Sequence, residues 1–447
     1  MNRVSVDTAG RPPSVDALAR ELAIRHSLPH AILVDCARRA IANSSAQQNA
    51  QQTVQQTVQQ ADQLATEFSQ SLLREVVNAT GVLLHTNLGR APVEIHITDR
   101  ASNLELNMRT GERGSRQETV GKLLALLCGA ESAIVVNNNA AAVLLVVAAL
   151  ANSRDVAVSR GESVEIGGNF RIPEVTEQSG ARLVDVGTTN RTRLRDYKKA
   201  IEKRGNDIAL VLKVHPSNYR VSGFVEDTPM RELATLPVPV VADIGSGLID
   251  NTCPWLEGRT PAWLANEPAA RQTLSDGASL VMFSGDKLFG GPQCGVIAGR
   301  ADLVEACAQH PLARALRPGS LTMISMQSLA LSYLGRTATT DVAFWKMAST
   351  SVAELKLRAK KIITASQVGE VCLLESIPGA GSAPGASIAS AGVVIAGDHL
   401  AKLRNRQVPI IARVKESKTY FDLRTVRSED DYLLIDALRS VVESPTQ

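Results

Sequence analysis

The sequence predicts an α/β protein whose main body is a mainly parallel sheet, with a helical module before it and a small α+β domain after it. From residue 78 onward, short apolar runs alternate with helical stretches, as in a parallel sheet covered on both faces. Upstream, residues 1–75 contain no lysine and include a glutamine-rich tract, which indicates a separate module. Residues 377–391 form a loop rich in Gly, Ala and Ser within the final α+β part.

Composition limits the classes of protein that this chain can be. Its 447 residues, 44% of them apolar, allow two or three domains with a large core. The net charge is only +3, so attraction to nucleic acid or anionic lipid would need local patches. Six scattered cysteines without a C-x-x-C pair, and no signal-like segment after Met1, predict a cytoplasmic protein. No run reaches the ~18 apolar residues of a membrane helix, so we expect no membrane partner.

The N-terminal module is expected to be helical. Residues 14–24 form one predicted helix with Ser14 as N-cap, and a second begins at Pro29 and runs to residue 41. The glutamine-rich tract, residues 47–63, is either a helix or a linker. Six Arg and six Asp or Glu balance one another through Gln70, so the module has no obvious surface for RNA.

The chain is organised around the stretch Ser284-Gly-Asp-Lys-Leu-Phe-Gly-Gly-Pro-Gln-Cys-Gly295. The apolar run before it has strand character and places Lys287 at a strand end, where glycines and a proline force a turn. Ser284, three residues before Lys287, offers a hydroxyl that could bind a phosphate while the lysine forms an imine. Pyridoxal phosphate needs both groups at once. A surface lysine in a glycine-rich loop is the alternative.

Two asparagines are candidates for a phosphate cradle. A predicted strand, residues 131–136, leads through Asn137 into an apolar helix that starts at Ala140. Free backbone N–H groups in the first turn of a helix bind phosphate, each contact contributing about 0.3–1 kcal/mol. Asn138 and Asn139 stand at this position. Simple capping of the helix is the alternative, because asparagine is a favoured N-cap.

Three further cofactor residues follow predicted strands. Asp243 ends the apolar strand 238–243, where it could hold a pyridine nitrogen protonated or merely cap the next turn. His215 and Asn218 follow the strand 208–214, and Asn218 could bond to the 3′ oxygen of the cofactor. Two more strands are expected, at residues 155–159 and 182–186. Along the chain, the predicted phosphate cradle is followed by Asn218, then Asp243, then the Ser-x-x-Lys motif. This is the order found in the aspartate-aminotransferase fold, which is fold type I of the pyridoxal phosphate enzymes.

Residues 76–330 are expected to form the catalytic domain and residues 331–447 the small α+β domain. Arg314 and Arg317 lie three apart, on one side of a helix or turn, and are either anion ligands or a solvated basic face. Arg413 ends a strand in the last domain, a position that in this class of fold often meets a substrate carboxylate.

Taken together, the motifs resemble those of the bacterial selenocysteine synthases, the L-seryl-tRNA(Sec) selenium transferases. The resemblance runs from about Val77 to Thr425, and the stretches that carry it are residues 78–92, 110–116, 135–142, 159–168, 186–191 and 284–293. It implies an aspartate-aminotransferase-like fold, active sites at subunit interfaces and a decameric ring of dimers. It also associates the N-terminal module with recognition of tRNA(Sec).

The resemblance implies roles for individual residues as well. Lys287 would be the imine lysine, and Asp286, Arg90, Arg314 and Arg317 would line the pocket for the selenium donor. The implied reaction converts L-seryl-tRNA(Sec) to L-selenocysteinyl-tRNA(Sec) with selenophosphate, through an aminoacrylyl intermediate on pyridoxal phosphate. A related pyridoxal phosphate lyase, acting on a free amino acid or an amino sugar phosphate, is the alternative. A non-catalytic tRNA-binding relative would have no need of the lysine motif.

Overall fold

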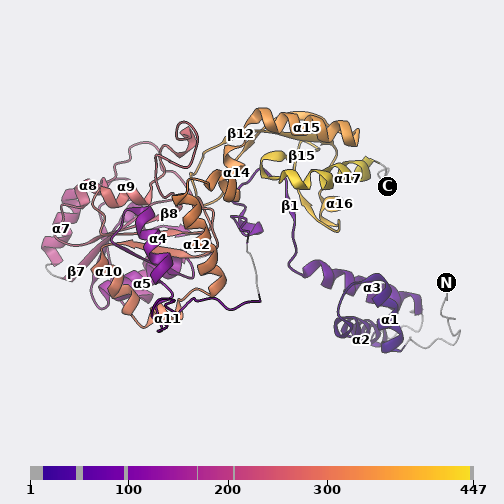
Figure 1. Cartoon of the computed structure of the whole chain (residues 1–447), viewed down its shortest axis with the longest axis horizontal. Coiled ribbons are helices and arrows are strands. Elements are labelled where there is room, and N and C mark those ends of the chain that lie inside the picture. Colours follow the sequence, from indigo (N-terminus) through magenta and orange to yellow (C-terminus); the bar gives the residue numbers. More distant parts are fainter. Residues whose placement is uncertain (1–13, 47–53, 95–98, 169, 205–206, 443–447) are drawn as a thin grey trace. The chain divides into compact units, whose positions relative to one another are not determined.

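The computed structural model describes residues 14–46, 54–94, 99–168, 170–204 and 207–442. It divides into two compact units, Met1–Val76 and Val77–Gln447, which are described separately here (Figure 1). Within the described ranges, no helix is long and apolar enough to cross a membrane.

The first unit is a bundle of three helices, α1 (Val15–Arg25), α2 (His30–Ala46) and α3 (Val54–Ser71). The hydroxyl of Ser14 accepts a hydrogen bond from the N–H of Ala17 at 3.2 Å, which confirms the predicted N-cap. A core of small and aliphatic side chains holds the helices together: Leu18, Ala19, Leu22, Leu33, Cys36, Ala37, Ala40, Ala61 and Ala65. Within the glutamine-rich tract, residues 54–63 are helical, while residues 47–53 lie outside the described ranges.

The second unit contains a seven-stranded sheet. In spatial order its strands are β2 (Ser132–Val136), β10 (Gly295–Gly299), β9 (Leu280–Ser284), β8 (Val240–Gly245), β7 (Ile208–Val214), β3 (Asp155–Ser159) and β6 (Arg182–Val186). Only β10 runs antiparallel to its neighbours in this sheet. The predicted mainly parallel α/β sheet is confirmed. The sequence analysis missed β10, because its short run lies between glycines that indicated only a turn.

Helices cover both faces of this sheet (Figure 1). Alternate strand residues point to opposite faces, so Val281 and Phe283 pack on one side while Leu280 and Met282 pack on the other. One face carries α4 (Glu118–Cys128), α9 (Ala270–Ser275), α12 (Ser320–Leu334), α13 (Ala338–Asp341) and α14 (Ala343–Ser349), with α7 (Leu194–Arg204) and α8 (Met230–Leu233) further along it. The other face carries α5 (Asn139–Ala151), α6 (Ile172–Gln178), α10 (Ala301–Gln309) and α11 (Leu312–Ala315).

A four-stranded antiparallel sheet follows, in the order β11 (Glu370–Ser376), β12 (Ile388–Ala396), β15 (Lys418–Asp422) and β14 (Arg413–Lys415). It is accompanied by α15 (Val352–Ser366), α16 (Leu400–Arg404) and α17 (Asp431–Val442). The short elements of the second unit are β1 (Val77–Asn78), β4 (Glu165–Ile166), β5 (Phe170–Arg171), β13 (Ile410–Ile411), η1 (Thr86–Leu88), η2 (Arg160–Glu162), η4 (Ala262–Leu264), η5 (Leu423–Thr425) and η6 (Ser428–Asp430).

Within the second unit, each of the two predicted domains contributes residues to the core of the other. Strand β1 pairs in parallel with β13, and both Val77 and Ala79 lie in the core of the C-terminal sheet. Conversely, Phe344 and Trp345 on α14 belong to the core of the seven-stranded sheet. The three-part division predicted from the sequence stays a prediction.

Candidate active site

Lys287 lies in the turn that follows β9, at the carboxyl end of the parallel strands. The N–H of Leu288 donates to the carbonyl oxygen of Ser246 at 2.9 Å, which ties this turn to the end of β8. Gly290 has a φ of 74°, a conformation that glycine adopts without strain. Lys287 is only 5% exposed. The surface-lysine alternative is therefore wrong.

Two glycines leave room for the Lys287 amine. A Cβ added at Gly381 would lie 2.7 Å from Nζ, and one added at Gly245 would lie 3.8 Å from it. Gly245 ends β8, whereas Gly381 belongs to the glycine-rich loop between β11 and β12. That loop is joined to the main body by a hydrogen bond of 2.9 Å from the Leu84 N–H to the Pro378 carbonyl oxygen. The C-terminal loop thus closes directly over the lysine.

Burial lowers the pKa of Lys287, and the positive charge of Arg90 lowers it further. The negative charges of Asp243, Asp286 and Glu267 act in the opposite direction without overcoming these effects. A lowered pKa increases the fraction of neutral amine, which is the nucleophilic and basic form.

Lys213 on β7 provides a contrast. Its amine pairs with Asp227 at 2.7 Å and with Glu162 at 3.2 Å. Burial lowers its pKa, but the charges of these two carboxylates outweigh burial and the pKa is raised. The surroundings of Lys213 therefore stabilise its ammonium form, whereas those of Lys287 favour the neutral amine, which is the reactive form.

Asp243 stands on β8, 2% exposed. Its Oδ1 accepts hydrogen bonds from Asn139 Nδ2 at 2.8 Å and from the Gly245 N–H at 3.0 Å. Its Oδ2 is buried without a partner in the described part of the chain. Burial raises the pKa of Asp243, while the bond from Asn139 and the charge of Lys287 lower it. One oxygen therefore caps the next turn, and the other is available to a cationic donor.

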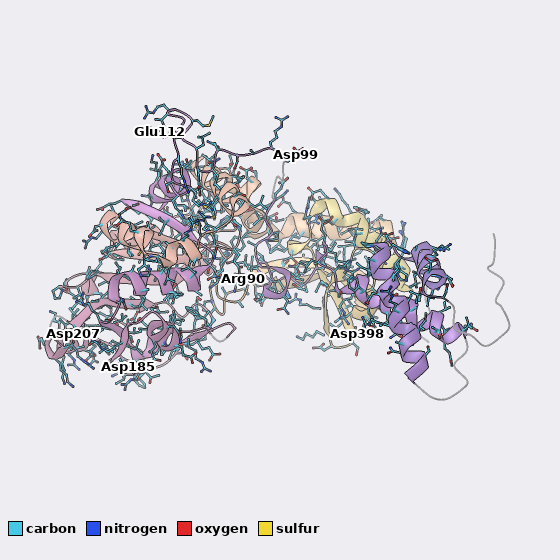
Figure 2. All side chains as sticks on the ribbon, turned by 90° about the horizontal axis from the view of Figure 1, so that it is seen from below. Arg90, Asp99, Glu112, Asp185, Asp207 and Asp398 are labelled. Carbon is cyan, nitrogen blue, oxygen red and sulfur yellow. The ribbon has the colours of Figure 1, made fainter. Side chains whose placement is uncertain are left out.

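Arg90 and Asp286 form an ion pair beside the lysine. Arg90 Nη1 lies 2.8 Å from Asp286 Oδ2, and Asp286 is 4% exposed. Arg90 has a φ of 63°, a left-handed conformation that costs a non-glycine residue about 1–2 kcal/mol. The Arg90 side chain is 28% exposed, whereas Asp185, Asp207 and Asp398, which are also labelled in Figure 2, are exposed surface residues. Strain at a partly buried charged residue is typical of functional sites.

His215 and Asn218, the two cofactor residues predicted after β7, lie in different surroundings. His215 lies in the cluster, because its N–H donates to the Asp243 carbonyl oxygen at 2.9 Å. Asn218 is exposed, and its Nδ2 donates to the carbonyl oxygen of Glu165 at 3.2 Å. Ser217, between them, is fully buried, and its Oγ lacks a partner among the described residues. In this structure Ser217, which the sequence analysis did not single out, faces the site instead of Asn218.

The side chains of Asn138 and Asn139, the two residues predicted to form the phosphate cradle, are both hydrogen-bonded to other residues of the protein. Asn138 caps α5 by accepting a hydrogen bond from the Ala141 N–H at 2.8 Å, and Asn139 is bonded to Asp243. The backbone N–H groups at the start of α5 stay a predicted phosphate site. Ser284, the last residue of β9, is 6% exposed, and its predicted role also stays a prediction.

Arg314 and Arg317 lie near each other but apart from the lysine cluster. Arg314 is exposed on α11, and Arg317 Nη1 lies 3.4 Å from Glu105 Oε1. Both line a cavity of about 580 Å³ together with Arg116. Its lining does not include Arg90 or Lys287, so one chain does not gather the three predicted arginines around a single cavity.

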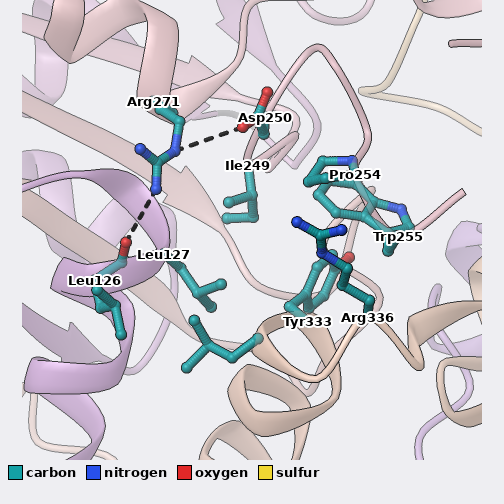
Figure 3. Close-up of a pocket in the computed structure, with 10 residues that line it drawn as sticks. Leu126, Leu127, Ile249, Asp250, Pro254, Trp255, Arg271, Tyr333 and Arg336 are labelled. Atoms are coloured by element: carbon teal, nitrogen blue, oxygen red, sulfur yellow. Dashed lines mark hydrogen bonds and ion pairs between the residues drawn. The ribbon is translucent and has the colours of Figure 1, made fainter.

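A second cavity, of about 250 Å³, lies between α4, α12 and the loop after β8 (Figure 3). Arg271 at its edge pairs with Asp250 at 3.5 Å and donates to the carbonyl oxygen of Leu126 at 3.2 Å. The rings of Trp255 and Tyr333 pack edge-on, with their centroids 4.7 Å apart. No residue of the Lys287 cluster lines this cavity, so we do not place the active site there.

The second unit matches a known protein family over most of its length. The model of the SelA family, described as L-seryl-tRNA selenium transferase, matches residues 76–427. Relatives described as L-seryl-tRNA(Sec) selenium transferase include one from Alkaliphilus metalliredigens, 37% identical over 84% of both chains. Those from Geobacter sulfurreducens and Carboxydothermus hydrogenoformans are 39% and 40% identical over 83% and 80% of both chains.

A solved structure of D-glucosaminate-6-phosphate ammonia-lyase is similar in fold, with a TM-score of 0.56 and 21% identity, covering 84% of this chain and 98% of that one. At this identity the likeness concerns the fold alone. The family match confirms the resemblance predicted from the motifs, together with the enzyme class and the pyridoxal phosphate cofactor that it implied. The chain belongs to the L-seryl-tRNA selenium transferase family.

Proposed function

We propose that this chain converts L-seryl-tRNA(Sec) to L-selenocysteinyl-tRNA(Sec) with selenophosphate as the selenium donor. The observation that carries the proposal is the buried Lys287 with its lowered pKa beside Asp243, whose Oδ2 has no partner in the described structure. Family membership supports the substrate, and this cluster supports the chemistry.

The residues around Lys287 fit pyridoxal phosphate. When bound, this cofactor acts as an electron sink, which makes loss of a proton from the substrate Cα accessible. Asp243 Oδ2 is a buried acceptor suited to a protonated ring nitrogen, and such a cation would favour the ionised carboxylate against the effect of burial. Ser217 Oγ, Ser284 and the first-turn N–H groups of α5 would hold the ring oxygen and the phosphate.

Lys287 is the base in this proposal. Its amine, whose pKa is lowered by burial and by the charge of Arg90, takes the Cα proton of the seryl group. In this proposal the protonated amine then gives a proton to the departing seryl hydroxyl, so one residue both receives and returns a proton. Gly381 lies directly against the amine, and Lys287 is only 5% exposed.

The donor anion would be bound by Arg90, Arg314 and Arg317. Guanidinium groups form paired, charge-assisted hydrogen bonds to phosphate-like anions. Because Arg314 and Arg317 line a cavity apart from Arg90 in the single chain, we propose that a neighbouring subunit supplies the pair. This arrangement fits a homo-oligomer with active sites at its interfaces, of which a decamer is the form that the sequence resemblance implies.

The proposal assigns tRNA(Sec) recognition to the three-helix unit, which is supported by its compactness and by its position ahead of the catalytic unit in the chain. It also places the reaction in the cytoplasm. The six free cysteines, five of them buried, suit a reducing compartment.

The test is an assay of purified, cofactor-loaded protein with seryl-tRNA(Sec) and selenophosphate, read out by mass spectrometry of the released aminoacyl group. Parallel reactions contain free L-serine or D-glucosaminate 6-phosphate. We expect selenocysteine only with seryl-tRNA(Sec). Release of ammonia from a small substrate, with seryl-tRNA left unchanged, would assign the chain to the lyases instead.

A further inference from the structure

Glu267 is a buried carboxylate that the sequence analysis did not single out. It lies between η4 and α9, and its side chain is 2% exposed. Its Oε2 accepts a hydrogen bond from the Ala383 N–H at 3.0 Å. Its Oε1 has no hydrogen-bond partner among the described residues and lies 3.7 Å from His215 Nε2. Half of this carboxylate is therefore available to a ligand.

The contacts of Glu267 place it next to the Lys287 amine. Ala383 stands two residues after Gly381, the glycine that abuts Lys287 Nζ, and has a left-handed φ of 44°. On the other side, the N–H of His215 is bonded to the carbonyl oxygen of Asp243. The negative charge of Glu267 is also among those that act on the pKa of Lys287. Glu267 therefore contributes a negative charge to the surroundings of the Lys287 amine.

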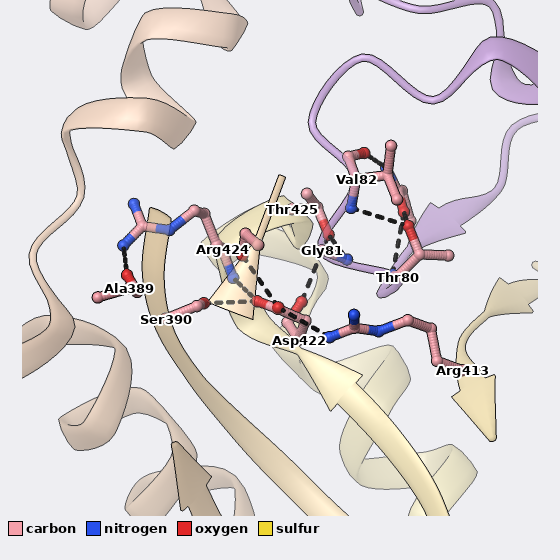
Figure 4. Close-up of polar contacts among 11 residues, drawn as sticks. Thr80, Gly81, Val82, Ala389, Ser390, Arg413, Asp422, Arg424 and Thr425 are labelled. Carbon is pink, nitrogen blue, oxygen red and sulfur yellow. Dashed lines mark hydrogen bonds and ion pairs between the residues drawn. The ribbon is translucent and has the colours of Figure 1, made fainter. Parts of the chain in front are cut away.

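The arginine that the sequence suggested for a substrate carboxylate has an internal partner. Arg413 Nη2 lies 3.4 Å from Oδ2 of Asp422, which is fully buried (Figure 4). The hydroxyls of Ser376 and Ser390 donate to the same carboxylate at 2.9 and 2.6 Å, and the Arg424 N–H donates to it at 3.1 Å. Arg413 is thus paired with a carboxylate that belongs to the protein.

We propose that Glu267 is a specificity-determining residue that selects an esterified seryl group over a free amino acid, a conclusion that rests on the proposed function. A seryl ester carries an α-ammonium group and no carboxylate, whereas free serine carries both. The unpaired oxygen of Glu267 attracts the ammonium group of either compound and repels the carboxylate of the free one. Repulsion of the wrong substrate is an effective source of specificity. Arg413, the arginine that the sequence suggested for a substrate carboxylate, is instead paired with Asp422.

The experiment uses two small probes, L-serinamide and L-serine, which differ in the carboxylate. The full-length, cofactor-loaded protein is titrated with each, and binding is followed by the change in the absorption band of the cofactor. Neither tRNA nor a selenium donor is needed, so the result is independent of whether selenium transfer occurs. We expect the wild type to prefer serinamide, and Glu267→Gln to reduce that preference by about tenfold or more, mainly through tighter binding of serine.

Two controls accompany this titration. Glu267→Gln keeps an oxygen that can accept from Ala383, so an unchanged thermal unfolding midpoint would show that the loop contact survives. Asp276→Asn, at the other end of α9 and paired with Arg231 at 2.7 Å, removes a carboxylate away from the lysine and should leave the preference unchanged. A wild type without preference for serinamide, or the same preference in folded Glu267→Gln, would overturn the proposal.

Discussion

Asn139 Nδ2 donates a hydrogen bond to Asp243 Oδ1 at 2.8 Å, joining the start of α5 to the end of β8. The sequence indicated both residues but gave them separate tasks, at opposite ends of a cofactor. Asn139 and Asp243 are 104 residues apart in the chain. They meet because β2, which precedes α5, and β8 belong to the same sheet. The bond holds one oxygen of Asp243, and the other is buried without a partner among the described residues.

Replacing the two neighbouring asparagines should therefore cause different defects. Asn139→Ala removes a hydrogen bond to a charged group, worth about 1.5–3 kcal/mol, and raises the pKa of Asp243, so turnover should fall about tenfold or more. Asn138→Ala removes the cap of α5 and should cost about 1 kcal/mol of stability with a smaller loss of turnover. Unfolding in denaturant measures the loss of stability of each variant, and steady-state kinetics measures its loss of turnover. Equal activity losses in both variants would contradict the assignment.

Arg90→Gln should raise the pKa of Lys287. The substitution removes a positive charge that lowers this pKa and leaves the negative charge of Asp286, which raises it, without its partner. Both changes favour the ammonium form, so the neutral amine should appear only at higher pH. Acylation of Lys287 in cofactor-free protein, followed against pH by mass spectrometry, measures this. A profile that stays in place or moves to lower pH would be inconsistent with the ion pair described here; the exposed Arg195→Gln serves as control.

Gly381→Ala should displace the end of the Lys287 side chain and weaken its use, because the new Cβ would lie 2.7 Å from Nζ and 3.0 Å from Cε. Gly385→Ala is a matched control in the same loop: its φ of 74° is close to the 80° of Gly381, but nothing lies within 4 Å of the added Cβ. Both variants carry similar backbone strain, of about 1–2 kcal/mol. We expect only Gly381→Ala to lose cofactor binding, measured by absorbance after gel filtration. Similar losses in both would attribute the effect to strain alone.

Asp422→Ala should strongly destabilise the second unit. It leaves the buried hydroxyls of Ser376 and Ser390 and the Arg424 N–H without their acceptor, and each buried donor left unsatisfied costs about 1–3 kcal/mol. The free energy of unfolding in urea measures the loss. The exposed Asp398→Ala should change it by less than about 0.5 kcal/mol. A small effect at Asp422 would mean that this network contributes little to folding.

Local patterns were sufficient for much of the fold. Strands β3, β6 and β7 begin and end where the apolar runs do, and α1 begins after Ser14 as its capping pattern predicts. The position of Lys287 in a turn after a strand was also predictable, because strand, serine, lysine and glycines are contiguous in the sequence, while its role in catalysis stays a prediction. These features depend on residues close together in the chain, so periodicity and turn chemistry report them directly.

The residues that sequence reasoning missed come from distant segments. Gly381 abuts Lys287 Nζ only because the C-terminal loop folds back onto the main body, and Glu267, between η4 and α9, is joined to that loop by the Ala383 N–H. Neither residue stands in a recognisable local pattern. Ser217 and Asn218 are adjacent, and which of them faces inward depends on the turn after β7. The position of Arg314 and Arg317 relative to Lys287 depends in our proposal on a second subunit, which no pattern within one chain can specify.

The most direct test of the central claim is to identify the lysine that bears the cofactor. The loaded protein is reduced with borohydride and digested, and the modified peptide is sequenced by mass spectrometry. The account predicts modification at Lys287, with its lowered pKa, and none at Lys213, which two carboxylates hold as an ammonium ion. Modification at Lys213 or at any other lysine, with Lys287 unmodified, would contradict it.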